Sequence, residues 1–105
     1  MADNGQQHYA PELFPKTRER LRQLAERAVA LHLRFELAAA LRVILQKLEQ
    51  FPIPWGEPLH HSHNGGIVYR AIHWQLLVRY AVLEAQRLVW VLDIVPLSGH
   101  PLVQD

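Results

Sequence analysis

The stretch from Gly65 to Val95 constrains the fold most, because three apolar runs follow one another there with few polar residues between them. The runs are Ile67–Ile72, Leu76–Leu83 and Leu88–Val95, and all three are rich in β-branched and aromatic residues. Such runs, separated by short polar breaks, are typical of strands joined by tight hairpins. The stretch therefore predicts a three-stranded antiparallel meander.

The segment before the meander is helical in pattern. Apolar residues recur at helical spacing in two stripes, over residues 21–31 and 37–51. If the first stripe continued without a break, Arg42 and Glu49 would fall in the core. The phase must therefore shift, and we expect two helices with a break near residues 31–34.

Helices followed by a small meander predict an α+β fold, with a helical hairpin packed on a small, mainly antiparallel sheet. His8–Pro11 is expected to add a short first strand, and the first helix to begin at Pro15–Thr17. Pro52 and Pro54 should end the second helix. The 105 residues, half of them hydrophobic, predict one domain over 1–105, with residues 1–7 as a disordered tail.

Composition excludes several classes of protein. The chain has no cysteine, which rules out a disulfide scaffold and thiolate metal sites. No apolar run approaches the roughly 20 residues that a membrane span needs, so a cytoplasmic protein without membrane contact is expected. Eight of the eleven Lys and Arg lie before Phe51, and we interpret them as solvated helix faces rather than a nucleic-acid surface. His60, His61 and His63 lack the spacing of a metal motif, so residues 52–66 are expected to be an exposed loop, without metal or cofactor.

The register of the meander follows if the hairpins turn at Trp74-Gln75 and Ala85-Gln86. Arg70 then faces Arg79, and Arg79 also faces Leu92. One face carries Val68, Arg70, Ile72, Leu77, Arg79, Ala81, Trp90, Leu92 and Ile94. The other face, expected to lie under the helices with Asp93 at its margin, carries Ile67, Tyr69, Ala71, Val78, Tyr80, Val82, Val89, Val91 and Val95.

The open face would hold two unusual features. Like charges directly opposite each other are unfavourable, so Arg70 and Arg79 need an anion, which is a phosphate, an acidic partner side chain, or a local carboxylate. Candidates for a local carboxylate are Glu36, Glu57 and Glu84. The same face would expose a large apolar patch, which usually marks a partner site. Its members are Leu77, Trp90, Leu92 and Ile94.

This layout resembles the RelE/ParE superfamily of bacterial type II toxins, which have a short first strand, a helical hairpin and a three-stranded meander. The resemblance covers roughly Tyr9 to Leu97. It is carried by Tyr9-Ala10-Pro11-Glu12 at the step from strand to helix, Gly56-Glu57-Pro58-Leu59 before the meander, Tyr69-Arg70, and Val78, Tyr80 and Val82. The sequence departs from the family at two places. Leu77 stands where the family has an arginine in the third strand. Pro96-Leu97 stands near the place where the family has a His-Arg step after the last strand.

The resemblance implies a toxin of a toxin–antitoxin system, acting as a ribosome-associated mRNA endoribonuclease. Arg70 and Arg79 would supply the cations for such a reaction, and His73 or Tyr80 the base. Two alternatives are a non-catalytic, gyrase-inhibiting toxin and a non-toxic interaction protein that keeps the fold. The implied partner is a cognate antitoxin that covers the apolar patch, with a homodimer through the same surface as the alternative.

Overall fold

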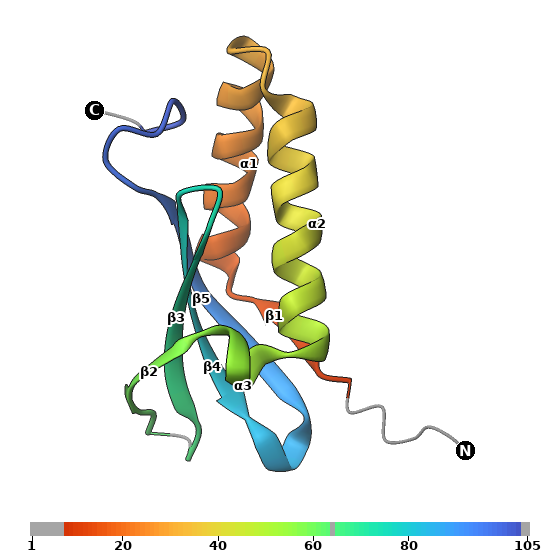
Figure 1. Cartoon of the computed structure of the whole chain (residues 1–105), viewed down its shortest axis with the longest axis vertical. Coiled ribbons are helices and arrows are strands. Elements are labelled where there is room, and N and C mark those ends of the chain that lie inside the picture. Colours follow the sequence, from red (N-terminus) through yellow and green to blue (C-terminus); the bar gives the residue numbers. More distant parts are fainter. Residues whose placement is uncertain (1–7, 64, 104–105) are drawn as a thin grey trace.

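The computed structural model describes residues 8–63 and 65–103, and it confirms the α+β fold (Figure 1). Five strands form one sheet in the order β1-β5-β4-β3-β2, and three helices pack on it. The elements are β1 (Ala10–Leu13), α1 (Pro15–Ala30), α2 (Arg34–Gln50), α3 (Pro52–Trp55), β2 (Glu57–His61), β3 (Ile67–His73), β4 (Leu76–Leu83), a 3-10 turn (Glu84–Gln86) and β5 (Leu88–Pro96). The predicted tail, residues 1–7, lies outside the described residues.

The helical hairpin is confirmed. The first helix ends at Ala30, and His32 adopts a left-handed conformation with φ of 61° in the tight turn that follows. The Leu33 amide donates to the Ala28 carbonyl over 2.7 Å, so the turn satisfies a terminal carbonyl of α1. The second helix ends at Gln50, as the following prolines predicted.

The first hairpin of the meander turns where predicted. Trp74 and Gln75 both have positive φ, 53° and 55°, which is the pattern of the hairpin turn whose twist matches that of the strands. Arg70 pairs directly with Arg79, and Tyr69 with Tyr80. The β3–β4 register is therefore the predicted one.

The second hairpin follows the predicted register only as far as Tyr80, which pairs with Val91. Beyond it the register shifts by one residue, so Arg79 pairs with Asp93 rather than with Leu92. Leu92 is the extra residue of a β-bulge. The Thr17 hydroxyl lies 3.0 Å from the Leu92 carbonyl oxygen and 3.2 Å from the Val91 carbonyl oxygen, so α1 is fastened to the sheet at the bulge.

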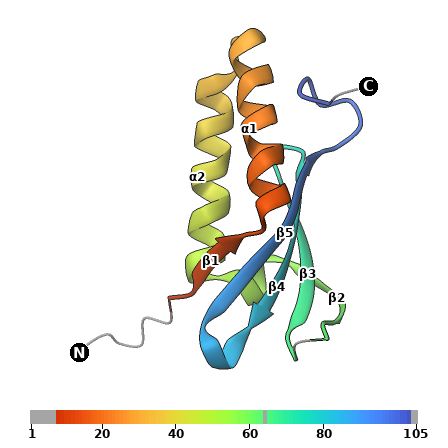
Figure 2. The same ribbon diagram turned by 180° about the vertical axis from the view of Figure 1, so that it is seen from behind.

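Two expectations for the sheet edges were wrong. Residues 57–61, predicted as loop, form the edge strand β2; all five are exposed, so they carry no alternating apolar pattern. The first strand runs over Ala10–Leu13 rather than His8–Pro11, because pairing begins where the Ala10 amide donates to the Arg87 carbonyl. It lies parallel to β5, as Figure 2 shows.

The core lies between the helices and one face of the sheet. Buried residues from α1, α2 and the strands β3, β4 and β5 form it, among them Leu24, Ala28, Leu37, Ile44, Leu48, Val78, Val89 and Val91. Tyr80 is fully buried, and its ring stacks between those of Tyr69 and Trp55, with centroids 5.6 and 5.8 Å away. Its hydroxyl donates to the Pro52 carbonyl over 2.6 Å. The stack therefore ties α3 to the sheet.

Candidate functional site

The face of the sheet opposite the helices carries a cluster of charged side chains. Arg70 contacts Glu57, its neighbour on β2, with 2.9 Å between Nε and Oε1. Asp93 of β5 faces two arginines, Arg20 of α1 and Arg79 of β4. Arg20 Nε lies 3.4 Å from one carboxylate oxygen and Arg79 Nη2 lies 3.9 Å from the other. One carboxylate thus serves two guanidinium groups, and the cluster of five groups carries a net positive charge.

The two arginines of the predicted pair contact different carboxylates. Glu57, one of the three acidic residues proposed from sequence, is the partner of Arg70. Asp93, expected at the margin of the core face, lies on the open face because the bulge turns it there. These pairs are about half exposed on the arginine side, so their contribution to stability is small, about 0–1 kcal/mol each. Their guanidinium groups stay accessible to an anionic partner.

An apolar hollow of about 230 Å³ lies on the same face, lined by residues of β3, β4 and β5 and by one residue just after each of β1 and β2. Its lining is Phe14, Ser62, Val68, Ala81, Leu83, Trp90 and Leu92. Val68, Ala81 and Leu83 are buried, while Trp90 and Leu92 are partly exposed. The Phe14 and Trp90 rings pack together, with centroids 5.3 Å apart. The hollow can therefore accept an apolar side chain between fixed aromatic and aliphatic groups.

The predicted apolar patch is only partly formed. Trp90 and Leu92 line the hollow, whereas Leu77, at the far end of this face, pairs with Val95. Ile94 was wrongly placed on the open face. The bulge at Leu92 inverts the alternation beyond it, so Ile94 pairs with Val78 and is buried in the core.

The four residues proposed as catalytic do not converge. Strand side chains alternate between faces, so Arg70 and Arg79 lie on the open face, while His73 and Tyr80 lie on the side that the helices cover. Burial raises the pKa of Tyr80, and the neighbouring Tyr69 raises it further. With its proton also committed to Pro52, the Tyr80 hydroxyl is a structural donor and not a general base.

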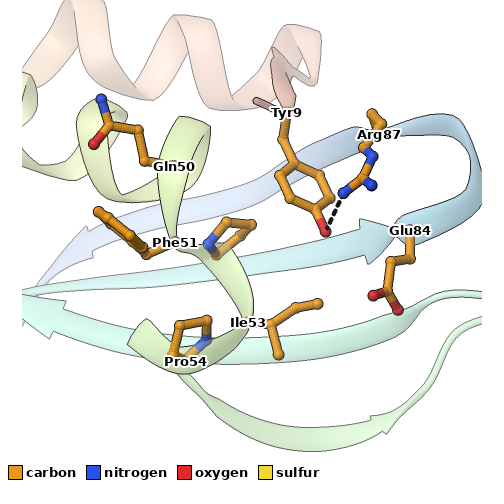
Figure 3. A pocket seen from close by; sticks show the side chains of 8 residues that line it. Tyr9, Gln50, Phe51, Ile53, Pro54, Glu84 and Arg87 are labelled. Carbon is orange, nitrogen blue, oxygen red and sulfur yellow. Dashed lines mark hydrogen bonds between the residues drawn. The ribbon is translucent and has the colours of Figure 1, made fainter. Parts of the chain in front are cut away.

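A second hollow, of about 370 Å³, lies where α2 and α3 meet the β4–β5 hairpin (Figure 3). Sequence reasoning missed it, because its lining comes from three segments that are far apart in the sequence: Tyr9, residues 50–54 and the hairpin that holds Glu84 and Arg87. Arg87 packs over the Tyr9 ring, 5.3 Å from its centroid, and donates to the Tyr9 hydroxyl over 3.3 Å. Glu84 stands beside Arg87, and Phe51 is among the residues of the apolar wall. This hollow thus offers one cation and one carboxylate above an apolar floor.

His100 has a structural role, and the histidines form no metal site among the described residues. Within residues 8–63 and 65–103, no three His, Asp or Glu side chains lie close enough to hold a metal ion. His100 is buried, accepts a hydrogen bond from the Leu102 amide over 2.9 Å, and packs edge-on against Trp74. It therefore anchors the C-terminal segment to the first hairpin, away from Arg70.

The fold and the open face define an α+β protein with a candidate binding surface. Comparisons of the chain with protein-family models, curated proteins and solved structures find no match. No helix in the described part of the chain is long and apolar enough to cross a membrane.

Proposed function

We propose that this chain is the toxin of a type II toxin–antitoxin pair of the RelE/ParE type, and that it acts by binding rather than by cleaving RNA. The observation that carries the proposal is the open face of the sheet, where an apolar hollow lies beside a cluster with surplus positive charge. The order of elements, a short strand, a helical hairpin and an antiparallel meander, supports the family.

The geometry favours the binding mode over the endoribonuclease mode. Cleaving an RNA phosphodiester needs a base within reach of the 2′-hydroxyl and cations around the developing charge. Arg70 and Arg79 offer cations, but His73 and Tyr80 lie on the other side of the sheet. The non-catalytic, gyrase-inhibiting branch is therefore the better description.

The antitoxin that fits this face is a segment with both apolar and acidic side chains, either an amphipathic helix or an extended strand. One aliphatic or aromatic side chain in the hollow between Phe14 and Trp90 would contribute about 1.5–3 kcal/mol. Acidic residues on the segment would pair with Arg20 and Arg79, which share the single carboxylate of Asp93. One segment would thus use both features of the face.

The test is inducible expression in bacteria with growth as the readout. The wild type should arrest growth while mRNA stays intact by primer extension. The control is Arg18→Ala, which alters an exposed α1 side chain outside the charged cluster and outside the lining of the hollow. It should arrest growth equally. Normal growth despite soluble accumulation of the protein would refute the toxin proposal. Cleaved mRNA would instead establish the endoribonuclease mode.

A further inference from the structure

The exposed face of α2 is unusually apolar for a helix on the surface. Phe35 is 74% exposed and Leu45 is 44% exposed, and Ala38 and Ala39 are exposed between them. Helix α1 differs, since its outer face carries Glu19, Arg22 and Glu26 joined by ion pairs one turn apart. Large apolar side chains near both ends, with small ones between, are suited to close packing against another helix.

The charges on α2 are unpaired within the described part of the chain. Glu36, Arg42 and Glu49 are all exposed, and none of them forms an ion pair among residues 8–63 and 65–103. Ion pairs along one helix need a spacing of three or four residues, whereas these charges are six and seven residues apart. These side chains are therefore available to pair with charges on a partner surface.

We propose that two copies of this chain pack antiparallel through the exposed face of α2. The two-fold axis crosses that face at the level of Ala40, whose own side chain is buried in the core. Phe35 and Leu45 are equidistant from Ala40, so each Phe35 lies beside Leu45 of the other copy. The midpoint between Glu36 and Arg42 along the helix is Ala39, one residue from the level of the axis. Glutamate and arginine side chains are long enough to bridge this difference, so Glu36 of one copy pairs with Arg42 of the other. The same face is therefore complementary to itself, as a two-fold interface requires.

A third contact arises at the two ends of the interface. The midpoint between Arg34 and Glu49 along the helix lies within about half a helical turn of Ala40. Glu49 of one copy therefore reaches Arg34 of the other. Arg34 already lies over the Phe35 ring, 4.9 Å from its centroid. Every apolar and charged contact occurs twice by symmetry.

The tip of the helical hairpin provides a receptacle for the incoming copy. A hollow of about 320 Å³ is lined there by Val29, His32, Arg34 and Phe35, and Val29 is 56% exposed. Leu45 of the other copy arrives at this end of α2 in the antiparallel arrangement. Figures 1 and 2 show the tip standing beyond the sheet, so the sheet does not obstruct the approach.

The size of the interface sets the expected strength. Helix α2 has 17 residues and is therefore about 25 Å long. A single helix pair of this length buries less than the roughly 800 Å² per partner of a standard stable interface. We therefore expect a reversible dimer whose population rises with protein concentration.

The experiment is sedimentation velocity over a concentration series of the full chain. The wild type should shift from monomer to dimer, and Leu45→Glu should raise the dimer Kd at least about tenfold, since two apolar contacts are lost. Glu36→Arg alone and Arg42→Glu alone should also weaken the dimer, and the double charge swap should restore it. Arg18→Glu, on the exposed surface of α1, is the matched control and should leave the dimer unchanged.

Three outcomes would overturn the proposal. The first is a wild type that is monomeric at every concentration, as expected if α2 binds a different protein. The second is a dimer that persists in Leu45→Glu. The third is a double charge swap that fails to restore the dimer. Circular dichroism would establish that each variant is folded. The proposal does not rest on toxicity, because the sheet takes no part in it, and Trp90→Glu should leave dimerisation intact. Loss of the dimer in Trp90→Glu, with retention in Leu45→Glu, would move the interface to the open face of the sheet.

Discussion

Tyr80→Phe tests how the short helix α3 is held on the sheet. The Tyr80 hydroxyl is fully buried and donates to the Pro52 carbonyl over 2.6 Å. Removing the hydroxyl leaves that buried carbonyl without a partner, which costs about 1–3 kcal/mol. The stacking of the ring between Tyr69 and Trp55 is retained, so the loss is that of the hydrogen bond alone.

Thermal and urea denaturation would measure the effect. For a domain of about 100 residues, each kcal/mol shifts the melting midpoint by about 4–8 °C, so a fall of roughly 5–20 °C is expected. The urea m-value should not change, because the surface exposed on unfolding is the same. An unchanged midpoint would refute the argument, since it would mean that the hydroxyl contributes no net stability.

The same variant makes a prediction about alkaline pH. Burial raises the pKa of Tyr80, and burial followed by the nearby Glu84 raises the pKa of Tyr69. The folded state therefore holds these protons more tightly than the unfolded state, where tyrosine has a pKa of about 10. Stability is fully present below that pH and falls as pH rises above it. In Tyr80→Phe the free energy of unfolding should fall less steeply with pH above about 10, because only Tyr69 still contributes. Equal slopes for the wild type and the variant would contradict this.

Three other substitutions test separate features. Gly56→Ala should destabilise the protein by about 1–3 kcal/mol, measured by urea denaturation, because a Cβ there would clash with the Tyr80 hydroxyl and lie 3.0 Å from the Arg70 carbonyl oxygen. Thr17→Val should cost about 1–3 kcal/mol by removing the hydroxyl donor from the Leu92 carbonyl, whereas the Val91 carbonyl keeps the Phe14 amide at 3.4 Å. An unchanged free energy of unfolding would show the contact to be dispensable. Trp90→Glu should abolish growth arrest while the far-ultraviolet circular dichroism stays native; a global loss of structure would instead place Trp90 in the main core.

Much of the fold was predictable, because periodicity reports which face of an element is buried. The phase shift between the two apolar stripes of the helical segment located the hairpin turn at His32. Placing the first hairpin turn at Trp74-Gln75 gave the pairing of Arg70 with Arg79 that the structure shows. The apolar stripes of the helices and the apolar runs of the strands are both readable because they face one shared core.

The site was less predictable, because it depends on one inserted residue. Nothing in the run Leu88–Val95 marks Leu92 as a bulge, since all its neighbours except Asp93 are apolar and either register looks acceptable. The consequence is large: beyond the bulge, Asp93 moves to the arginines and Ile94 moves to the core. The edge strand β2 was missed for the opposite reason, because its five exposed residues leave no pattern to detect.

The parallel pairing of β1 with β5 has a consequence for the timing of folding during synthesis. Ala10 pairs with Leu88, so the helices and the three preceding strands are made before the first strand has its partner. At about 5–20 residues per second, the ribosome needs several seconds to supply β5, whereas a helix forms in about a microsecond. The hairpin of α1 and α2 can therefore form before the strands that cover its core-facing leucines have all been made. During that interval the nascent chain presents chaperones with an amphipathic hairpin and an unpaired N-terminal strand.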